Sequence, residues 1–266
     1  MAAPLAFALA ALCFTGAALQ AQAIAYTAAA LACVQFDERI ESDIHGEAGG
    51  RPRDDAAGRV ARWIVRARPA GGDSLKIEAW YDSLALWRTT DDVRRSPDTD
   101  GIVGGRYRGM LSAAGAYRSV ARPFMPDEVA EYADLRDAFQ ELLPPLPPRP
   151  LRPGEIWRDS TGFELQRLGD STATGTVLQR YRLDRAGERR DSTFAVSDSV
   201  MLPIRQKTSE TGEFVWHPEL GLLRRMRRIT VETDVVAGKT LRYPIRSRLV
   251  QRVTLVRSPE TPGACR

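Results

Sequence analysis

Histidine and cysteine are scarce in this chain, whose 266 residues include two histidines and three cysteines. His45 and His217 lie far apart in the sequence, and neither belongs to a zinc-protease helix motif. The chain also lacks a Cys-x-x-Cys pair and a Gly-x-Ser-x-Gly nucleophile elbow. We therefore expect no catalytic residues, no bound metal and no cofactor.

One acidic segment nevertheless carries the donor oxygens that a cation needs. It precedes His45 and contains Asp37, Glu38, Glu41 and Asp43. The same composition is typical of a solvated acidic segment, which is the interpretation we favour.

Lysine is also rare, because only three of the 38 basic residues are lysines and the rest are arginines. The densest basic cluster is Arg224-Arg225-Met226-Arg227-Arg228. On a strand, these arginines alternate between two faces. That arrangement suits solvent exposure and cross-strand ion pairs better than a single phosphate-binding stripe. We therefore favour those roles over an anionic partner and expect no nucleic acid.

Residues 1–23 have the pattern of a secretory signal. Residues 5–19 are apolar and uncharged, and Ala21-Gln22-Ala23 is a small-x-small cleavage site. We expect export to the periplasm or the extracellular space and no membrane span in the mature chain. Two alternatives remain open: a buried N-terminal helix, and an uncleaved anchor that also includes the apolar residues 24–34.

Cleavage after Ala23 removes Cys13 and leaves Cys33 and Cys265 near the two ends of the chain. Two cysteines in an exported protein favour one disulfide. The sequence therefore predicts a Cys33–Cys265 bond. Lipidation at Cys33 is the alternative, with Ala30-Leu31-Ala32 as a poor lipidation signal.

Most of the chain has the pattern of antiparallel strands with one buried face. In residues 60–68 and 177–184, apolar residues alternate with polar or charged ones, and turn sequences separate such runs. Residues 127–143 differ, because an apolar three-to-four spacing after Pro126 predicts an amphipathic helix. Residues 144–153 are rich in proline and predict a stiff connector.

These patterns predict a mainly β protein with two tandem antiparallel halves, as a curved sheet or half-barrel, and one amphipathic helix between them. The first half covers residues 24–143 and ends in the helix. The connector covers residues 144–153, the second half covers residues 154–258, and a tail covers residues 259–266.

An internal repeat supports this division. Trp63, Asp73 and Asp82 are echoed at nearly constant spacing by Tyr181, Asp191 and Asp198. A further echo relates Tyr107 to Phe214 at a shorter spacing. We expect residues 60–122 and 177–235 to superpose, with Trp63 on Tyr181 and Asp82 on Asp198.

The connector carries a resemblance, through the segment Leu146-Pro147-Pro148-Arg149-Pro150-Leu151-Arg152-Pro153-Gly154-Glu155-Ile156-Trp157. With a helix before it and strands after it, this segment resembles one in a group of uncharacterised exported bacterial proteins, where an LPxxPLxxGxxW segment joins two β-rich halves. The resemblance implies no activity and no functional residues. More loosely, the expected sheet and helix resemble the half-barrels of periplasmic lipoprotein-localisation and lipid-carrier proteins, which implies architecture alone.

A concave apolar sheet can hold a small hydrophobic ligand. We therefore expect a non-enzymatic protein of the cell envelope that binds a lipid or another hydrophobic ligand. Its expected cavity is lined by five aromatic residues, Trp63, Tyr107, Phe139, Tyr181 and Phe214. The first alternative is a structural or interaction module with a filled core and an envelope protein as partner. The second alternative is a hydrolase.

Overall fold

The computed structural model describes residues 23–48, 51–173, 175–197, 200–235, 245–259 and 265. Apart from Ala23, the predicted signal sequence lies outside these residues. The long strands are β1 (Val34–Ala48), β2 (Arg51–Pro69), β3 (Ser74–Thr90), β10 (Thr176–Ser197), β11 (Val200–His217), β12 (Gly221–Val235) and β13 (Ile245–Ser258). The short strands are β4 (Val93–Arg95), β5 (Tyr107–Ser112), β6 (Tyr117–Ala121), β7 (Ile156–Arg158), β8 (Phe163–Arg167) and β9 (Ser171–Ala173).

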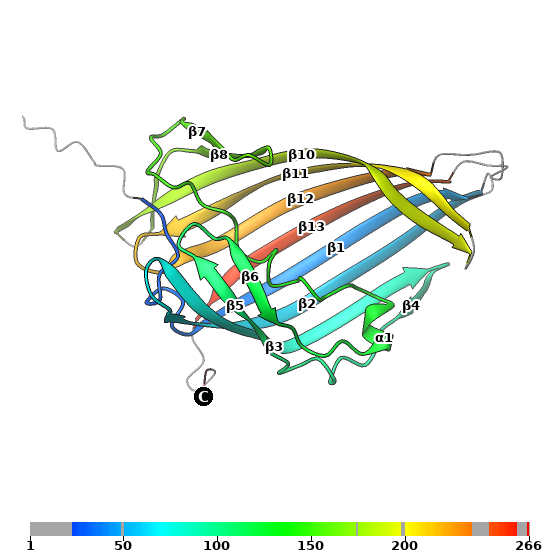
Figure 1. The fold of residues 1–266 in the computed structure, drawn as a ribbon, viewed down its shortest axis with the longest axis horizontal. Coiled ribbons are helices and arrows are strands. Elements are labelled where there is room, and N and C mark those ends of the chain that lie inside the picture. Colours follow the sequence, from blue (N-terminus) through cyan, green and yellow to red (C-terminus); the bar gives the residue numbers. More distant parts are fainter. Residues whose placement is uncertain are drawn as a thin grey trace, which may run out of the picture.

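The strands form one curved antiparallel sheet, which confirms the predicted fold class (Figure 1). Its order is β6-β5-β3-β2-β1-β13-β12-β11-β10-β8-β7, while β4 pairs with β3 and β9 with β10. The first and last strands, β1 and β13, pair along most of their length. This pairing joins the two expected halves into a single continuous sheet.

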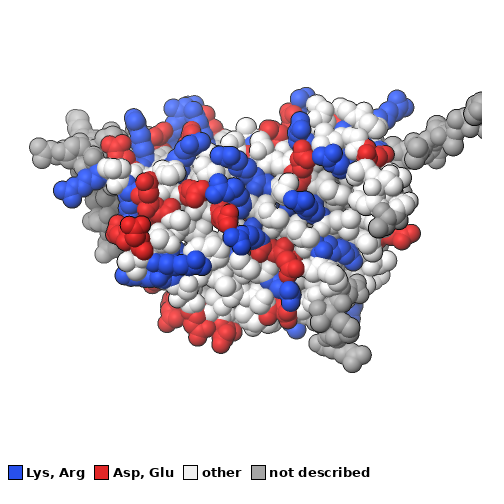
Figure 2. Space-filling view, turned by 180° about the vertical axis from the view of Figure 1, so that it is seen from behind, with Lys and Arg blue, Asp and Glu red and all other residues white. Residues whose placement is uncertain are grey.

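The two faces of the sheet differ in the way that the alternating sequence predicts. On β1, the even-numbered residues from Val34 to Ser42 are buried on the concave face, whereas Asp37 and Arg39 are exposed on the convex face. Figure 2 views the molecule from behind and shows basic and acidic side chains intermingled across that surface. The convex face is therefore a solvated, ion-paired surface, and the core lies on the concave face.

A strap, defined as residues 122–155, connects β6 at one edge of the sheet to β7 at the other. Side chains of the sheet hold its backbone carbonyls: Tyr107 Oη donates to Leu135 O at 2.7 Å, and Arg167 Nη1 donates to Leu151 O at 2.7 Å. The strap therefore crosses one end of the concave face and covers it.

The predicted helix over residues 127–143 is wrong in its extent. The one helix among the described residues, α1, is Asp127–Ala130, and turns follow it. The apolar spacing correctly marks buried residues, because Val129, Leu135 and Phe139 are buried. Turn hydrogen bonds and side chains of the sheet take up the carbonyls that a longer helix would use, so tertiary contacts override the helical pattern.

The apolar residues 24–34 pack into this covered end of the core. Ile24, Tyr26 and Leu31 are buried. The Tyr26 ring meets Trp216 edge-on at 5.3 Å, and its hydroxyl donates to Pro144 O of the strap at 2.9 Å. This burial accounts for the second apolar run of the sequence.

Cys33 and Cys265 form a disulfide with a Cα–Cα distance of 6.0 Å, in agreement with the predicted pair. Arg66 Nη1 donates to the Cys265 carbonyl at 3.2 Å. Arg257 Nη1 donates to Ala30 O at 3.1 Å, just before the first cysteine. The N-terminal segment is thus tied to the sheet and to the C-terminal end of the chain.

The structure agrees only in part with the predicted internal repeat. Within the two predicted repeat segments, residues 60–122 and 177–235, Trp63 lies on the first strand, β2, and Tyr181 also lies on the first strand, β10. The echo between Tyr107 and Phe214 has no counterpart in strand order, because within these segments Tyr107 lies on β5, the third strand paired in succession from β2, whereas Phe214 lies on β11, the second from β10. Asp198 lies outside the described residues.

Candidate functional site

The five aromatic residues predicted to line a cavity are core residues at the covered end. Trp63 contacts Tyr107 and Phe139 at ring-centroid distances of 5.4 and 6.1 Å, and Tyr181 stacks on Phe214 at 5.0 Å. All five are almost fully buried in one hydrophobic cluster. Because they fill the space between sheet and strap, the candidate site lies further along the concave face.

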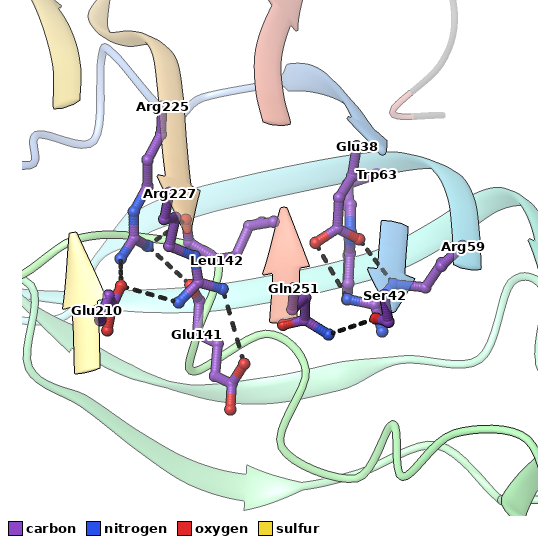
Figure 3. Close-up of polar contacts among 10 residues, drawn as sticks. All are labelled: Glu38, Ser42, Arg59, Trp63, Glu141, Leu142, Glu210, Arg225, Arg227 and Gln251. Atoms are coloured by element: carbon purple, nitrogen blue, oxygen red, sulfur yellow. Dashed lines mark hydrogen bonds and ion pairs between the residues drawn. The ribbon is translucent and has the colours of Figure 1, made fainter. Parts of the chain in front are cut away.

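A first polar cluster borders this aromatic core and is balanced in charge. The buried Glu38 accepts hydrogen bonds from Trp63 Nε1 at 3.1 Å and from Arg59 Nη2 at 3.0 Å (Figure 3). Each oxygen of the carboxylate thus has a donor, and one guanidinium faces one carboxylate. The acidic segment of the sequence divides here, since Glu38 faces inward while Asp37 faces outward.

A second polar cluster, on β11 and β12, contains two inward-facing arginines. Arg225 Nη1 donates to the strap carbonyls of Glu141 and Leu142, at 2.8 and 3.2 Å. Its Nη2 donates to Glu210 Oε1 at 3.3 Å. Burial, followed by the charge of Arg227, lowers the pKa of Arg225 to about 9.

Arg227 is the less satisfied of the two. Its side chain is 7% exposed, and its Nη1 donates to Glu210 Oε1 at 3.3 Å. Its Nη2 lies 3.7 Å from a carboxylate oxygen of Glu141, whose side chain is 65% exposed (Figure 3). Among the described residues, the Nε atoms of Arg225 and Arg227 have no hydrogen-bond partner.

Beyond these clusters the concave face becomes an uncharged trough. We define the trough by the inward-facing residues of four neighbouring strands: Ser42, Ile44 and Gly46 of β1; Ser247, Leu249 and Gln251 of β13; Ile229, Val231, Thr233 and Val235 of β12; and Ile204, Gln206 and Thr208 of β11. Its polar members bond across strands, as Gln251 Nε2 does to Ser42 Oγ at 3.3 Å. None of these described residues is ionisable.

Three apolar side chains form the middle of the trough. Val231 and Leu249 are opposite each other on β12 and β13, and Leu249 is opposite Ile44 on β1. All three are only partly buried, and none belongs to the hydrophobic cluster under the strap. The apolar middle of the trough therefore lacks the packing partners that the covered end has.

The same strands are charged on their other face. Glu232 and Arg248, the sequence neighbours of Val231 and Leu249, are exposed on the convex side, where they form an ion pair at 3.8 Å. Charged residues also stand at the sides of the trough, such as Asp55 with Arg88 on β2 and β3, paired at 3.1 Å. The lack of charge is thus particular to the trough.

Neither histidine belongs to a catalytic or metal-binding arrangement in the part of the chain that the structure describes. His45 Nδ1 lies 2.8 Å from an oxygen of Asp54 on the exposed surface. His217 Nδ1 accepts hydrogen bonds from the backbone of Glu219 and Leu220 within a turn. The described residues hold no group of three or more potential metal ligands. They also contain no helix with the length and hydropathy to span a bilayer.

The trough and the inward arginines were not predicted from the sequence. The arginines of β12 lie on alternating faces, as expected, but Arg225 and Arg227 are buried, which was not expected. The sequence did contain a signal for their burial. Alternate residues of a strand share one face, so Arg225 and Arg227 lie on the same face as the apolar Ile229, Val231 and Val235. An arginine on the apolar side of a strand is unusual and marks a buried ionic cluster.

No family model and no curated protein matches this chain. Among solved structures, one described as "lipid-protein interactions in lipovitellin" is similar, with a TM-score of 0.47 and 9% identity over 85% of this chain and 25% of that chain. A DUF1329 family protein from Desulfovibrio piger ATCC 29098 is similar with a TM-score of 0.17 and 10% identity, over 85% of this chain and 87% of its own. The chain thus spans about a quarter of the lipovitellin chain. Structural similarities this weak do not indicate a function for this chain.

Proposed function

We propose that this chain is an exported, non-enzymatic protein of the cell envelope that binds the hydrocarbon chain of a lipid in the trough. The observation that carries the proposal is the partly exposed apolar row Ile44, Leu249 and Val231, which lies next to a filled core and on the uncharged face of strands whose other face is charged. Covering such side chains with a hydrocarbon chain stabilises the complex by about 0.8 kcal/mol per buried CH₂ group.

The shape of the trough supports a long, thin ligand. From Ile229 to Val235 on β12 the trough is about 20 Å long, at the usual rise of an antiparallel strand. Its polar side chains are neutral, and several bond to one another across strands, as Gln206 does to Thr233. An acyl chain therefore meets no unpaired charge along the described trough.

The disulfide supports the exported location. Disulfides persist in oxidising compartments, and Cys33–Cys265 connects segments at opposite ends of the chain. The filled aromatic core favours the alternative of an interaction module without a ligand. That alternative leaves the uncharged, partly exposed trough without a role.

The proposal is tested by titrating the delipidated full chain with a fluorescent fatty acid. We expect saturable binding at micromolar protein. The variant Val231→Glu should abolish binding, because it places a charge in the trough. Thr230→Glu, on the convex side of the same strand, is the matched control and should bind as the unmodified chain does. Absence of saturable binding, or equal binding by both variants, would refute the proposal.

A further inference from the structure

The two polar clusters next to the trough differ in their charge balance. In the first cluster, Glu38 faces Arg59 and the charges cancel. In the second cluster, Arg225 and Arg227 face one buried carboxylate, that of Glu210. The other acidic partner, Glu141, is mostly exposed and lies 3.7 Å from Arg227. The second cluster therefore holds one buried positive charge more than its buried acid can neutralise.

The same cluster also has unused hydrogen-bond donors. A guanidinium offers five N–H donors in a planar fork. Among the described residues, Arg227 makes one hydrogen bond, to Glu210, and its Nε makes none. Buried donors are normally satisfied. The Nε atoms of Arg59, Arg88 and Arg167 also have no hydrogen-bond partner among the described residues, so the surplus of positive charge, rather than the unused Nε, distinguishes the second cluster.

The position of Arg227 connects this surplus to the trough. The next inward-facing residue on β12 is Ile229, followed by Val231, so the charged cluster lies at the end of the trough nearest the strap. On the other side of the cluster, the strap is fixed by the bonds from Arg225 to its carbonyls. A ligand in the trough would thus meet the guanidinium groups at the end where the strap closes the concave face.

We infer that the lipid is an anionic amphiphile whose carboxylate or phosphate group binds Arg227 and Arg225, with its hydrocarbon chain extending along the trough towards Val235. This inference rests on the proposed lipid-binding function. An oxyanion supplies the acceptors that the guanidinium forks lack and neutralises the surplus charge. The burial and mutual repulsion that lower the pKa of Arg225 leave it charged at neutral pH, where an anion can pair with it.

The test compares two ligands that share a hydrocarbon chain but differ in charge. Hexadecanoic acid and 1-hexadecanol are titrated into the full chain, with hexadecyl phosphate as a third ligand to separate a phosphate preference from a carboxylate preference. We expect at least one of the two anions to bind 10-fold or more tightly than the alcohol. In Arg227→Met, all ligands should bind with similar affinity, that of the alcohol.

Arg228→Met is the matched control, because Arg228 is the next residue on β12 and faces the convex surface. It should keep the full preference for the anion. Arg227→Lys retains the charge without the planar fork, so it should show an intermediate preference and serves if the methionine variant does not fold. If acids and alcohol bind the unmodified chain equally, the inference fails and the proposed function stands. If no ligand binds, the proposed function itself fails.

Discussion

Arg225 and Arg227 donate to the same carboxylate oxygen, Oε1 of Glu210, at 3.3 Å each. One buried carboxylate cannot neutralise two buried guanidinium groups, and the other acidic partner of Arg227, Glu141, lies 3.7 Å away with a largely exposed side chain. An arrangement of this kind costs folding stability unless a further anion completes it. We therefore expect the cluster to connect the stability of the fold with the proposed binding of an anionic ligand.

The first prediction concerns the stability cost of Arg227. We expect Arg227→Met to raise the free energy of unfolding by about 1 kcal/mol, because it replaces an under-satisfied buried charge by an apolar side chain and leaves Glu210 paired with Arg225. Urea unfolding of ligand-free protein measures the change. Arg228→Met on the exposed face should change stability by less than about 0.5 kcal/mol. A loss of stability in Arg227→Met would show that the charge is structurally required.

Removing Glu38 should have the opposite effect. Glu38→Ala leaves Arg59 and the indole N–H of Trp63 without their buried acceptor. We expect a loss of about 3 kcal/mol, as for other broken buried ion pairs. Glu41→Ala on the outward side of the same strand removes only surface pairs with Arg39 and Arg252 and should cost less than about 1 kcal/mol. Equal effects of the two variants would contradict the buried cluster.

Phe139 belongs to the filled core under the strap and lies outside the proposed ligand site. Its ring packs against Tyr117 at 4.8 Å and Trp63 at 6.1 Å. We expect Phe139→Ala to destabilise the protein by about 3–5 kcal/mol and to leave the affinity for a fatty acid unchanged. Phe124→Ala is the control, because that ring is 79% exposed and should contribute little. If Phe139→Ala lost fatty-acid binding but kept its stability, the ligand site would lie in the aromatic core instead of the trough.

The disulfide contributes stability by restricting the unfolded chain. Cys33→Ser combined with Cys265→Ser should lower the free energy of unfolding by about 5 kcal/mol, on the chain-entropy account of a long closed loop. Reductant should destabilise the unmodified protein by a similar amount and should not affect the double variant. An unmodified protein that is insensitive to reductant would mean that the two thiols are free.

Alternation in the sequence was sufficient to predict an antiparallel, mainly β fold, because one buried face leaves a period of two in strands such as β2. The same local pattern could not distinguish a helix from a buried strap, since Val129, Leu135 and Phe139 are buried in either case. The pairing of β1 with β13 joins the two ends of the chain and leaves no local trace. The trough was not predictable for the same reason, because its face is assembled from four strands.

Glu38 and Arg227 show which property of single buried charges the sequence could not predict. Both are charged residues on the buried side of a strand, and the sequence marks both in the same way. Only the cross-strand neighbours reveal that each carboxylate oxygen of Glu38 has a donor, whereas Arg227 shares the carboxylate of Glu210 with Arg225. Whether a buried charge is balanced by its neighbours can therefore be read from the tertiary structure but not from the sequence.

The most direct test of lipid binding in the trough is photo-crosslinking with a fatty acid that carries a diazirine near its terminal carbon, followed by peptide mass spectrometry. We expect crosslinks to inward-facing residues of β12 and β13, such as Val231 and Leu249. An excess of unlabelled fatty acid should suppress these crosslinks. Crosslinks to the convex neighbours Glu232 and Arg248, or no crosslink that unlabelled ligand suppresses, would contradict lipid binding in the trough.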